Sequence, residues 1–417
     1  MSSIAPAPHM NLASPAHADS HAASAATACD GVVCFGGIDW WYHNRGHAQT
    51  RIAMRFAQRA RTVWVNSIAM RMPVPGKTDL AWTRYLRKAR SLLKGLQYDA
   101  DADMWVYSPW FIPRYTPAML EFNGWLMSMQ VRAVTDYLNI RRPSTWVSIP
   151  TAVPAVERLN WHSIVFDRCD DFTTLPGADA QLIGALEQRM LDVCDHAAYV
   201  NDELFQREKN RVKHAEFIGH GVDFDHFVAC RPTQGPRTDV PPAMRDLPRP
   251  IVGFYGGMDD YRMDRDLMIK IARHVHAKGG TMILIGPDQM DLSKVRAEPN
   301  VVHIDQLPPD DLARHAAHYD VGIIPFYQNE FNVRCNPTKL KEYLALGYPI
   351  VAMKLPAFDP YDDLIIAVDS HEEFLAGIDT ALTETGDEMT ERRRAAVSGS
   401  SWDVVAHKVA KMLGTPN

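Results

Sequence analysis

GVVCFGG, residues 31–37, is a short apolar run that ends in two glycines. A polar loop follows it, and the helical pattern HAQTRIAMRFAQRA (47–60) then leads to a second apolar run, TVWVNS (62–67). Strand, glycine turn, helix and strand make a βαβ unit, which is typical of a parallel sheet covered by helices on both faces. The stretch therefore predicts an α/β fold with a doubly wound sheet.

The same pattern continues and then restarts. Further apolar runs follow to about residue 221, and PIVGFYGG (250–257) again joins a strand to a glycine pair. A segment dense in proline and polar residues separates the two series and reads as a linker. We expect two Rossmann-like domains, with these bounds: a disordered tail (1–29), an N-terminal domain (30–230), a linker (231–249), a C-terminal domain (250–395) and a last helix (396–417).

Composition narrows the class of protein. The 417 residues suit two domains, and a net charge of −6 does not favour a nucleic-acid binder. The six cysteines form no CxxC pair, which fits a reducing cytoplasm. No apolar run reaches the roughly 18 residues of a membrane span, and the tail lacks the pattern of a secretory signal.

Neither glycine turn carries the motif of a dinucleotide or ATP site. FGGIDWWYHNRG and YGGMDDYRMD contain no GxGxxG, and no Walker lysine loop is present. Ligands of open α/β sheets bind beyond the carboxyl ends of the strands. We therefore expect Gly36, Gly37, Gly256 and Gly257 to line a cleft between the two domains, although each pair would also suit a plain tight turn.

Several motifs of the second half occur in the order found in one enzyme group. They are GFYGGMDDYRMDRDL, ILIGP, VVHIDQLPPDDL, VGIIPF and NPTKLKEYLALGYPIVA. This order resembles the nucleotide-sugar domain of GT-B glycosyltransferases, and in particular the exopolysaccharide group that includes the xanthan glucuronosyltransferase. The resemblance implies two facing Rossmann-like domains and transfer of a sugar from a nucleotide donor.

The helix of the last motif is the predicted donor site. Asn336 suits an N-cap, Pro337 the first helical position and Gly347 the C-terminal end. Lys339 and Glu342 share a face away from the apolar stripe of Leu340, Tyr343 and Leu344. A helix start with a lysine suits a diphosphate, and Glu342 suits ribose hydroxyls, roles that the resemblance also implies. A solvent-exposed ion pair is the alternative.

Neighbouring residues complete the predicted donor set. The resemblance implies a hydroxyl or sugar contact for Glu330 and a donor contact for Met258, whose alternative is a packing role. Many retaining members carry a glutamate eight positions before the ribose residue, where this chain has Arg334. That departure favours inversion and leaves a cation for a phosphate or acidic sugar. The full donor set is Gly256, Gly257, Met258, Glu330, Arg334, Asn336, Thr338, Lys339 and Glu342.

The catalytic base is expected after the strand SIVFD (163–167). An inverting transfer needs a base for the acceptor hydroxyl, and the loop offers Asp170 and Asp171 beside Asp167. Asp170 aligns best with the catalytic aspartate of the resembling group, and Asp171 is the second choice. One of these aspartates would also suit the cap of the next helix. No cofactor or catalytic metal is expected, because a helix start and Lys339 can stabilise the leaving diphosphate.

The acceptor and the membrane are predicted on the N-terminal domain. Trp41, Arg45 and His47, in the loop after the first strand, are the acceptor candidates besides the first glycine pair. Residues 77–94 alternate basic and apolar side chains at helical spacing, which is typical of a helix on an anionic membrane surface. A helix packed on its own sheet with a cationic outer face is the alternative.

These features predict a cytoplasmic, peripherally membrane-bound enzyme that moves a sugar from a UDP-sugar to a lipid-linked or other saccharide acceptor. Inversion is the leading mechanism. A retaining transferase, a nucleotide-sugar epimerase and a non-catalytic sugar-binding protein are the alternatives.

Overall fold

The N-terminal half is built on a parallel sheet whose two faces are both covered. This computed structural model describes residues 28–42, 46–66, 90–175, 177–232 and 240–416. Within those residues the sheet has eight strands, with only the edge strand β3 antiparallel to its neighbour. In sheet order they are β3 (Leu96–Asp99), β4 (Met104–Tyr107), β2 (Arg61–Val65), β1 (Gly31–Phe35), β5 (Pro143–Val147), β6 (Ile164–Arg168), β7 (His196–Tyr199) and β8 (His214–Phe217).

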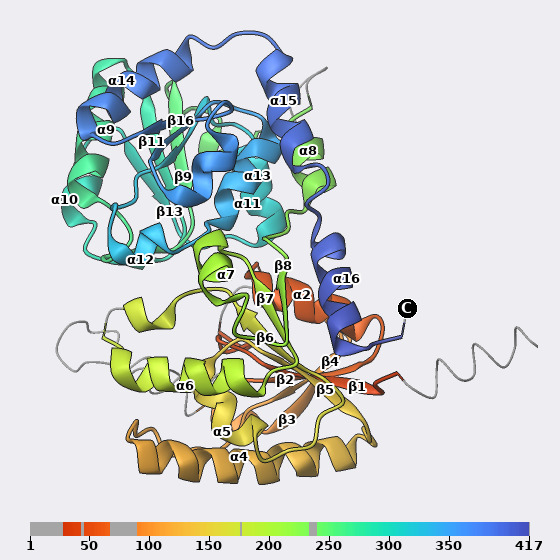
Figure 1. Ribbon diagram of the computed structural model, residues 1–417. Helices are drawn as coiled ribbons and strands as arrows, with labels where there is room; N and C mark the ends of the chain where they lie inside the picture. The colour runs from red at the N-terminus through yellow and green to blue at the C-terminus, as the bar shows by residue number, and fades with distance from the viewer. Residues whose placement is uncertain (1–27, 43–45, 67–89, 176, 233–239, 417) are drawn as a thin grey trace, which may run out of the picture.

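Alternation along the strands divides the N-terminal core in two. In β1, Val33 and Phe35 pack toward one face, and Val32 and Cys34 toward the other. Helices α4 (Pro117–Tyr137), α5 (Val153–Val156) and α6 (Ala180–Val193) cover the first face. Helix α2 (Ala48–Ala57) covers the second face (Figure 1). Helix α7 (Asp202–Glu208) lies between β7 and β8 in the chain and adds Leu204 to the core of the first face. Helix α8 (Phe224–Cys230) follows β8 and packs Phe227 against the core of the C-terminal half. Both faces of a parallel sheet are buried this way, which is why its strands read as continuous apolar runs.

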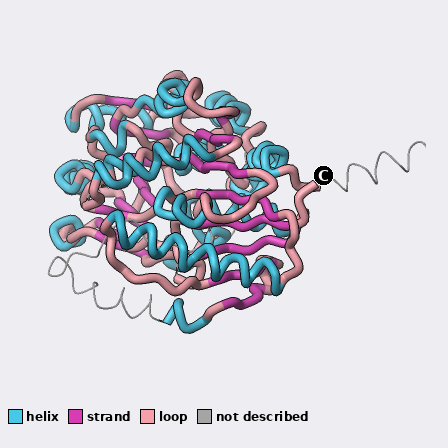
Figure 2. The backbone as a smooth tube through the Cα atoms, turned by 60° about the horizontal axis from the view of Figure 1, so that its bottom comes forward, coloured by secondary structure: helices cyan, strands magenta, loops and turns pink. Residues whose placement is uncertain are grey.

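The C-terminal half repeats this plan around one core. Among the described residues its sheet holds six parallel strands, in the order β13 (Val301–Ile304), β11 (Thr281–Ile285), β9 (Ile251–Tyr255), β14 (Val321–Ile324), β15 (Ile350–Met353) and β16 (Ile366–Val368). Its helices are α9 (Arg265–Ala277), α10 (Ser293–Arg296), α11 (Pro309–Ala316), α12 (Glu330–Val333), α13 (Thr338–Leu346), α14 (His371–Leu382) and α15 (Glu388–Val397). The short strands β10 (Met258–Asp259) and β12 (Asp288–Gln289) pair beside the main sheet. Figure 2 shows strands layered between helices.

The final helix, α16 (Trp402–Leu413), returns to the N-terminal half. It packs beside α2, and Val405 and Val409 join the core that holds Val32 and Cys34. Ser144 and Ser163 donate hydrogen bonds to the carbonyls of Leu413 and Met412 at 2.6 and 2.7 Å. The chain therefore passes between the two halves twice (Figure 1). Within the described ranges, no helix combines the length and apolar character needed to cross a membrane.

The prediction of two facing Rossmann-like domains in a GT-B arrangement is confirmed. The described residues of the proposed linker are 231–232 and 240–249, and they include one 3₁₀ turn, Pro242–Met244. Residues 1–27 of the predicted tail and 77–89 of the predicted basic helix lie outside the described residues.

Candidate active site

Three consecutive residues of the C-terminal half contact the N-terminal half. The Arg334 guanidinium lies 3.1 Å from a carboxylate oxygen of Asp171, and the Cys335 thiol donates to Asp170 at 3.4 Å. Asn336 donates from its amide to the carbonyl of Val200 at 2.7 Å. Residues 334–336 lead directly into α13, so the start of this helix faces the loop that follows β6. The predicted donor helix and the predicted base thus lie next to each other where the two halves meet.

Lys339 is a largely buried cation that forms no ion pair within the part of the chain that the structure describes. Its ammonium lies 5.1 Å from the ring centre of Phe254 and 5.8 Å from that of Phe326. No hydrogen bond or ion pair to this ammonium is present among the residues described. Burial, and then the positive charge of Arg262, lower the pKa of Lys339 to about 8. A buried, unpaired ammonium gains most from an anionic ligand.

Gly256 makes room for this lysine. Its φ of +134° is strained for other residues, and a Cβ there would lie 2.7 Å from the Lys339 Nζ atom. Gly286, with a φ of +136°, lies against Gly256 in turn, since a Cβ on it would meet the Gly256 carbonyl oxygen at 2.3 Å. Gly256 therefore serves close approach to a cation in this structure, which keeps the lysine beside the start of α13.

Arg262 is a site residue that the sequence analysis did not select. It stacks near the rings of Phe326 and Phe331, with its guanidinium carbon 5.6 and 5.1 Å from their centres. Burial opposes its charge, yet nearby acidic groups, including Cys335 and Asp170, hold the pKa of Arg262 above its usual range. The signal in the sequence was a basic residue in the loop after the second glycine pair, GGMDDYRMD. Arg262 and Lys339 together give the site two partly buried cations.

Glu342 lies one turn deeper in α13 and accepts a hydrogen bond. The Tyr255 hydroxyl donates to its carboxylate at 2.7 Å. Burial raises the pKa of Glu342, while the Tyr255 bond and Lys339 act in the opposite direction. The remaining lone pairs of this carboxylate suit ligand hydroxyls, as the sequence analysis expected.

The three aspartates after β6 have different environments. Burial raises the pKa of Asp170, and the positive charge of Arg262 opposes the shift. Asp171 is buried and bound by Thr173, Arg207 and Arg334, so its pKa lies below the usual range although burial opposes this. Burial raises the pKa of Asp167 to about 7, and Ser148 donates to it at 2.8 Å. Asp171 is thus held as an anion in ion pairs, whereas Asp170 has the raised pKa that suits a base.

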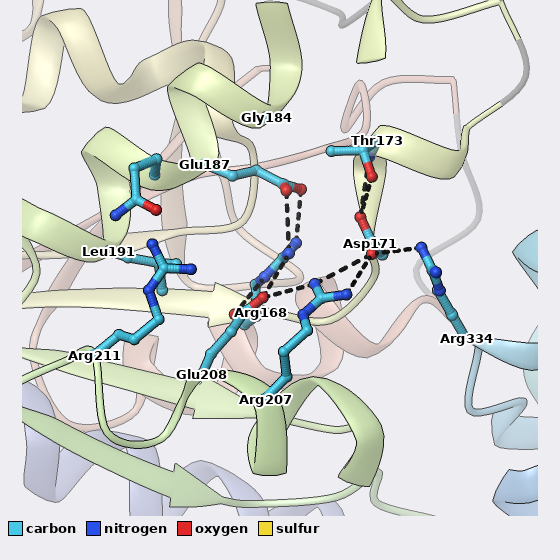
Figure 3. Close-up of a pocket in the computed structure, with 11 residues that line it drawn as sticks. Arg168, Asp171, Thr173, Gly184, Glu187, Leu191, Arg207, Glu208, Arg211 and Arg334 are labelled. Atoms are coloured by element: carbon cyan, nitrogen blue, oxygen red, sulfur yellow. Dashed lines mark hydrogen bonds and ion pairs between the residues drawn. The ribbon is translucent and has the colours of Figure 1, made fainter. Parts of the chain in front are cut away.

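A buried ionic network supports this loop from below. Arg168 is 1% exposed and binds Glu187 at 2.6 Å and Glu208 at 3.1 Å, and it also donates to the Asp170 carbonyl at 2.6 Å. Arg168, Glu187 and Glu208 line a pocket of about 220 Å³ whose lining also includes Arg334. Figure 3 shows these side chains. The bond from Arg168 fixes the Asp170 backbone, while the Asp170 carboxylate faces Cys335 of the C-terminal half.

Several predicted site residues have other roles here. The Trp64 ring occupies the space beside the Gly36 Cα atom, since a Cβ on Gly36 would lie 1.9 Å from that ring. Met258 is fully buried in the C-terminal core, which matches the packing alternative. Asn336 does not cap α13, whose N-cap is Pro337 without a side-chain bond. The Asn336 prediction as a cap was wrong because its amide bonds to Val200 across the site.

The remaining candidates have partners or positions of their own. Glu330 is exposed and pairs with Arg334 at 3.2 Å. Gly37 donates its N–H to Gln49, and the Trp41 indole donates to Ser108 at 3.3 Å. His47 is exposed before α2, while Arg45 lies outside the described residues. Thr338 and Gly257 lie at the start of α13 and before β10.

Comparisons with known proteins agree with this fold. Residues 249–384 match the family profile Glycosyl transferases group 1. A putative teichuronic acid biosynthesis glycosyltransferase of Bacillus subtilis is 23% identical over 302 residues, which cover 66% of this chain and 73% of that protein.

Solved structures show the same fold over most of the chain. A sucrose-phosphate synthase from Thermosynechococcus elongatus has a TM-score of 0.64 at 13% identity, covering 92% of this chain and 98% of its own. A UDP-forming α,α-trehalose-phosphate synthase from Burkholderia vietnamiensis has the same score and identity, with 92% and 99% covered. An Anabaena protein solved with UDP and glucose has a TM-score of 0.59 at 12% identity, again with 92% and 99% covered.

The class that the fold defines is GT-B. Within it, the family profile and the curated relative support a glycosyltransferase enzyme with a counterpart in polysaccharide biosynthesis.

Proposed function

We propose that the protein transfers a sugar from a UDP-sugar to a lipid-linked or other saccharide acceptor in surface polysaccharide synthesis. The observation that carries the proposal is the largely buried Lys339 ammonium, beside Arg262 and the start of α13, which pairs with no acidic group among the described residues. Two cations and a helix start together suit a diphosphate. The Anabaena structure with UDP and the UDP-forming synthase support UDP as the nucleotide.

In the proposed reaction, Asp170 removes the proton from an acceptor hydroxyl. The hydroxyl oxygen forms a bond to the anomeric carbon, and the bond from that carbon to the diphosphate oxygen breaks. UDP leaves with the electron pair, and Lys339, Arg262 and the α13 N–H groups stabilise its charge. Attack opposite the leaving group inverts the anomeric centre. The cations replace a metal in this scheme, so we expect activity to persist in EDTA.

Asp170→Asn tests the base. The variant should lose about a hundredfold to ten-thousandfold in turnover while its UDP affinity stays unchanged, because the amide cannot accept the proton. Asp192→Asn, an exposed aspartate on α6, is the matched control and should behave as wild type. Full activity of Asp170→Asn would exclude this base. NMR of the product would separate inversion from retention of the anomeric configuration, and retention would favour the retaining alternative. An epimerised nucleotide sugar without a new glycosidic bond would favour the epimerase alternative.

We further propose that the protein works at the cytoplasmic side of a membrane, where a lipid-linked acceptor is presented. The support is the basic amphipathic sequence of residues 77–94. Replacing its basic residues by glutamine should lower binding to anionic vesicles, and equal binding would remove this part of the proposal.

A further inference from the structure

Large exposed apolar side chains are concentrated in one part of the N-terminal half. Among the described residues they include Leu93, Tyr98, Trp110, Ile112, Phe122, Trp125, Met129 and Tyr137, while only a few lie elsewhere in the chain. Isolated exposed apolar residues are normal in soluble proteins, but a contiguous group marks an interaction surface.

Helix α4 carries large apolar side chains on both its buried and its exposed face. It buries Leu120, Met127 and Val131 against the sheet. Its outer face carries Phe122, Trp125 and Met129, which are 43%, 47% and 54% exposed and follow one another at helical spacing. The rings of Phe122 and Trp125 lie 5.6 Å apart. A surface helix ordinarily turns charged residues outward, so this outer face is built for an apolar environment.

The loop before α4 extends this surface. Gln130 accepts from the Trp110 N–H and donates to its carbonyl, both at 2.9 Å, and Asn123 does the same for Ile112 at 2.8 Å. The loop is therefore fixed along the helix with Trp110 and Ile112 turned outward. Trp110, Ile112, Phe122, Trp125 and Met129 are hereafter the aromatic face.

The aromatic face starts at the edge of the sheet where the site lies. The loop follows β4, which runs parallel to β2, β1, β5 and β6, so it leaves the same edge as the Asp170 loop. Figure 1 shows α4 along the outer side of the N-terminal half, away from the C-terminal half. A flat surface docked there leaves the other half free to move.

Basic side chains border this face. Arg114 and Arg132 are exposed, and within the described part of the chain neither guanidinium has a hydrogen bond or an acidic partner. Asp136 is exposed one turn beyond Arg132. Aromatic side chains favour the zone between lipid headgroups and acyl chains, and free cations favour anionic headgroups.

We infer that the aromatic face docks on the surface of an anionic phospholipid bilayer, with the Trp110, Phe122 and Trp125 rings in the interfacial zone. The inference rests on the proposed function, since a lipid-linked acceptor requires the sheet edge with Asp170 to lie near the bilayer. It assigns the apolar contact to α4 and its preceding loop, separate from the basic segment 77–94.

Vesicle sedimentation with the full chain tests the inference. Phosphatidylcholine vesicles with and without phosphatidylglycerol are compared for wild type and for the variant F122S/W125S/M129S. Loss of these apolar contacts should weaken binding to anionic vesicles at least about tenfold. The defect should persist in high salt, which screens the basic residues but not apolar insertion. Val404→Ser removes an exposed apolar side chain from α16 and is the matched control that should bind normally.

Unchanged binding of the triple variant, or no binding by wild type, would overturn the inference. So would a change in oligomeric state without a change in vesicle binding, since the face would then join two copies of the chain. UDP affinity and transfer to a water-soluble acceptor are measured on the same samples and should be unaffected by the substitutions. Failure of those two activities in wild type would contradict the proposed function instead, whatever the vesicles show.

Discussion

At the scale of single residues, Lys339 shows most clearly how a side chain that suits donor binding can lower the stability of the ligand-free protein. Its ammonium is buried against Phe254 and Phe326 without an acidic partner among the described residues. Burial of an unpaired charge costs folding free energy, which a diphosphate would offset by pairing with it. The ligand-free protein therefore carries a destabilising positive charge at the point where we place the donor.

Lys339→Met should stabilise the ligand-free protein and weaken donor binding. Removing the buried charge is expected to raise the free energy of unfolding by about 1–3 kcal/mol at pH 7. Loss of a charged hydrogen bond should lower UDP affinity about 10–100-fold. Thermal melts and calorimetric titration measure the two effects. Lys270→Met, an exposed lysine on α9, is the control, and equal UDP affinity in both variants would contradict the donor site.

The pH dependence of UDP binding follows from the same lysine. Its pKa is about 8 in the folded protein and 10.5 ordinarily, so the unfolded chain binds more protons between those values. The free energy of unfolding without ligand should therefore rise with pH across this window. UDP favours the charged ammonium, so its affinity should fall above about pH 8 and binding should take up protons.

Calorimetry in buffers of different ionisation enthalpy counts those protons. Lys341 also has a pKa lowered to about 8, by burial and then by Lys408, but it bonds to the His220 carbonyl outside the proposed donor contacts. Proton uptake should therefore disappear in Lys339→Met alone. Uptake that persists there would assign the effect to Lys341.

At the scale of elements, the segment before α13 joins the two halves. Arg334 bridges Asp171 of the N-terminal half and Glu330 of its own, at 3.1 and 3.2 Å. Arg334→Glu would place a carboxylate against the buried Asp171, and like charges there repel. We expect a larger radius of gyration by small-angle X-ray scattering and a lower turnover. Arg314→Glu, an exposed charge reversal on α11, is the control. Unchanged scattering would show that this ion pair does not hold the halves together.

The elements also show what sequence can and cannot predict. Lys339 and Glu342 followed from their spacing on one helix, and the strands from apolar runs, because both depend on local periodicity. Arg262 was missed because a loop conformation brings it to the site, and loops have no such period. Asn336 fits a cap by composition, yet a carbonyl of the other half competes for its amide. The roles of the donor and base residues stay predictions.

At the scale of the whole molecule, α16 ties the end of the chain to the first half. Trp402 is 3% exposed and fills the space over Gly221, where a Cβ would lie 2.5 Å from its ring. The sequence predicted a helix here but not the surface it would cover, because an apolar stripe shows that one face is buried and not which element it packs against. Trp402→Ala should lower the free energy of unfolding by about 3–5 kcal/mol.

Denaturant unfolding of Trp402→Ala, compared with the exposed neighbour in Val404→Ala, measures that loss. A decrease in the free energy of unfolding below about 1 kcal/mol would mean that α16 contributes little to the N-terminal core.

The two crossings between the halves meet at one place. The Val222 N–H donates to the Ser400 carbonyl at 2.8 Å, and Val222 pairs with Ser401 in an isolated bridge. Because two chain segments are hydrogen-bonded side by side here, we expect the halves to rotate about this contact more easily than they slide or separate. The distance from this contact to Asp170 and Lys339 then determines how much a rotation of a few degrees changes the separation across which the sugar must move.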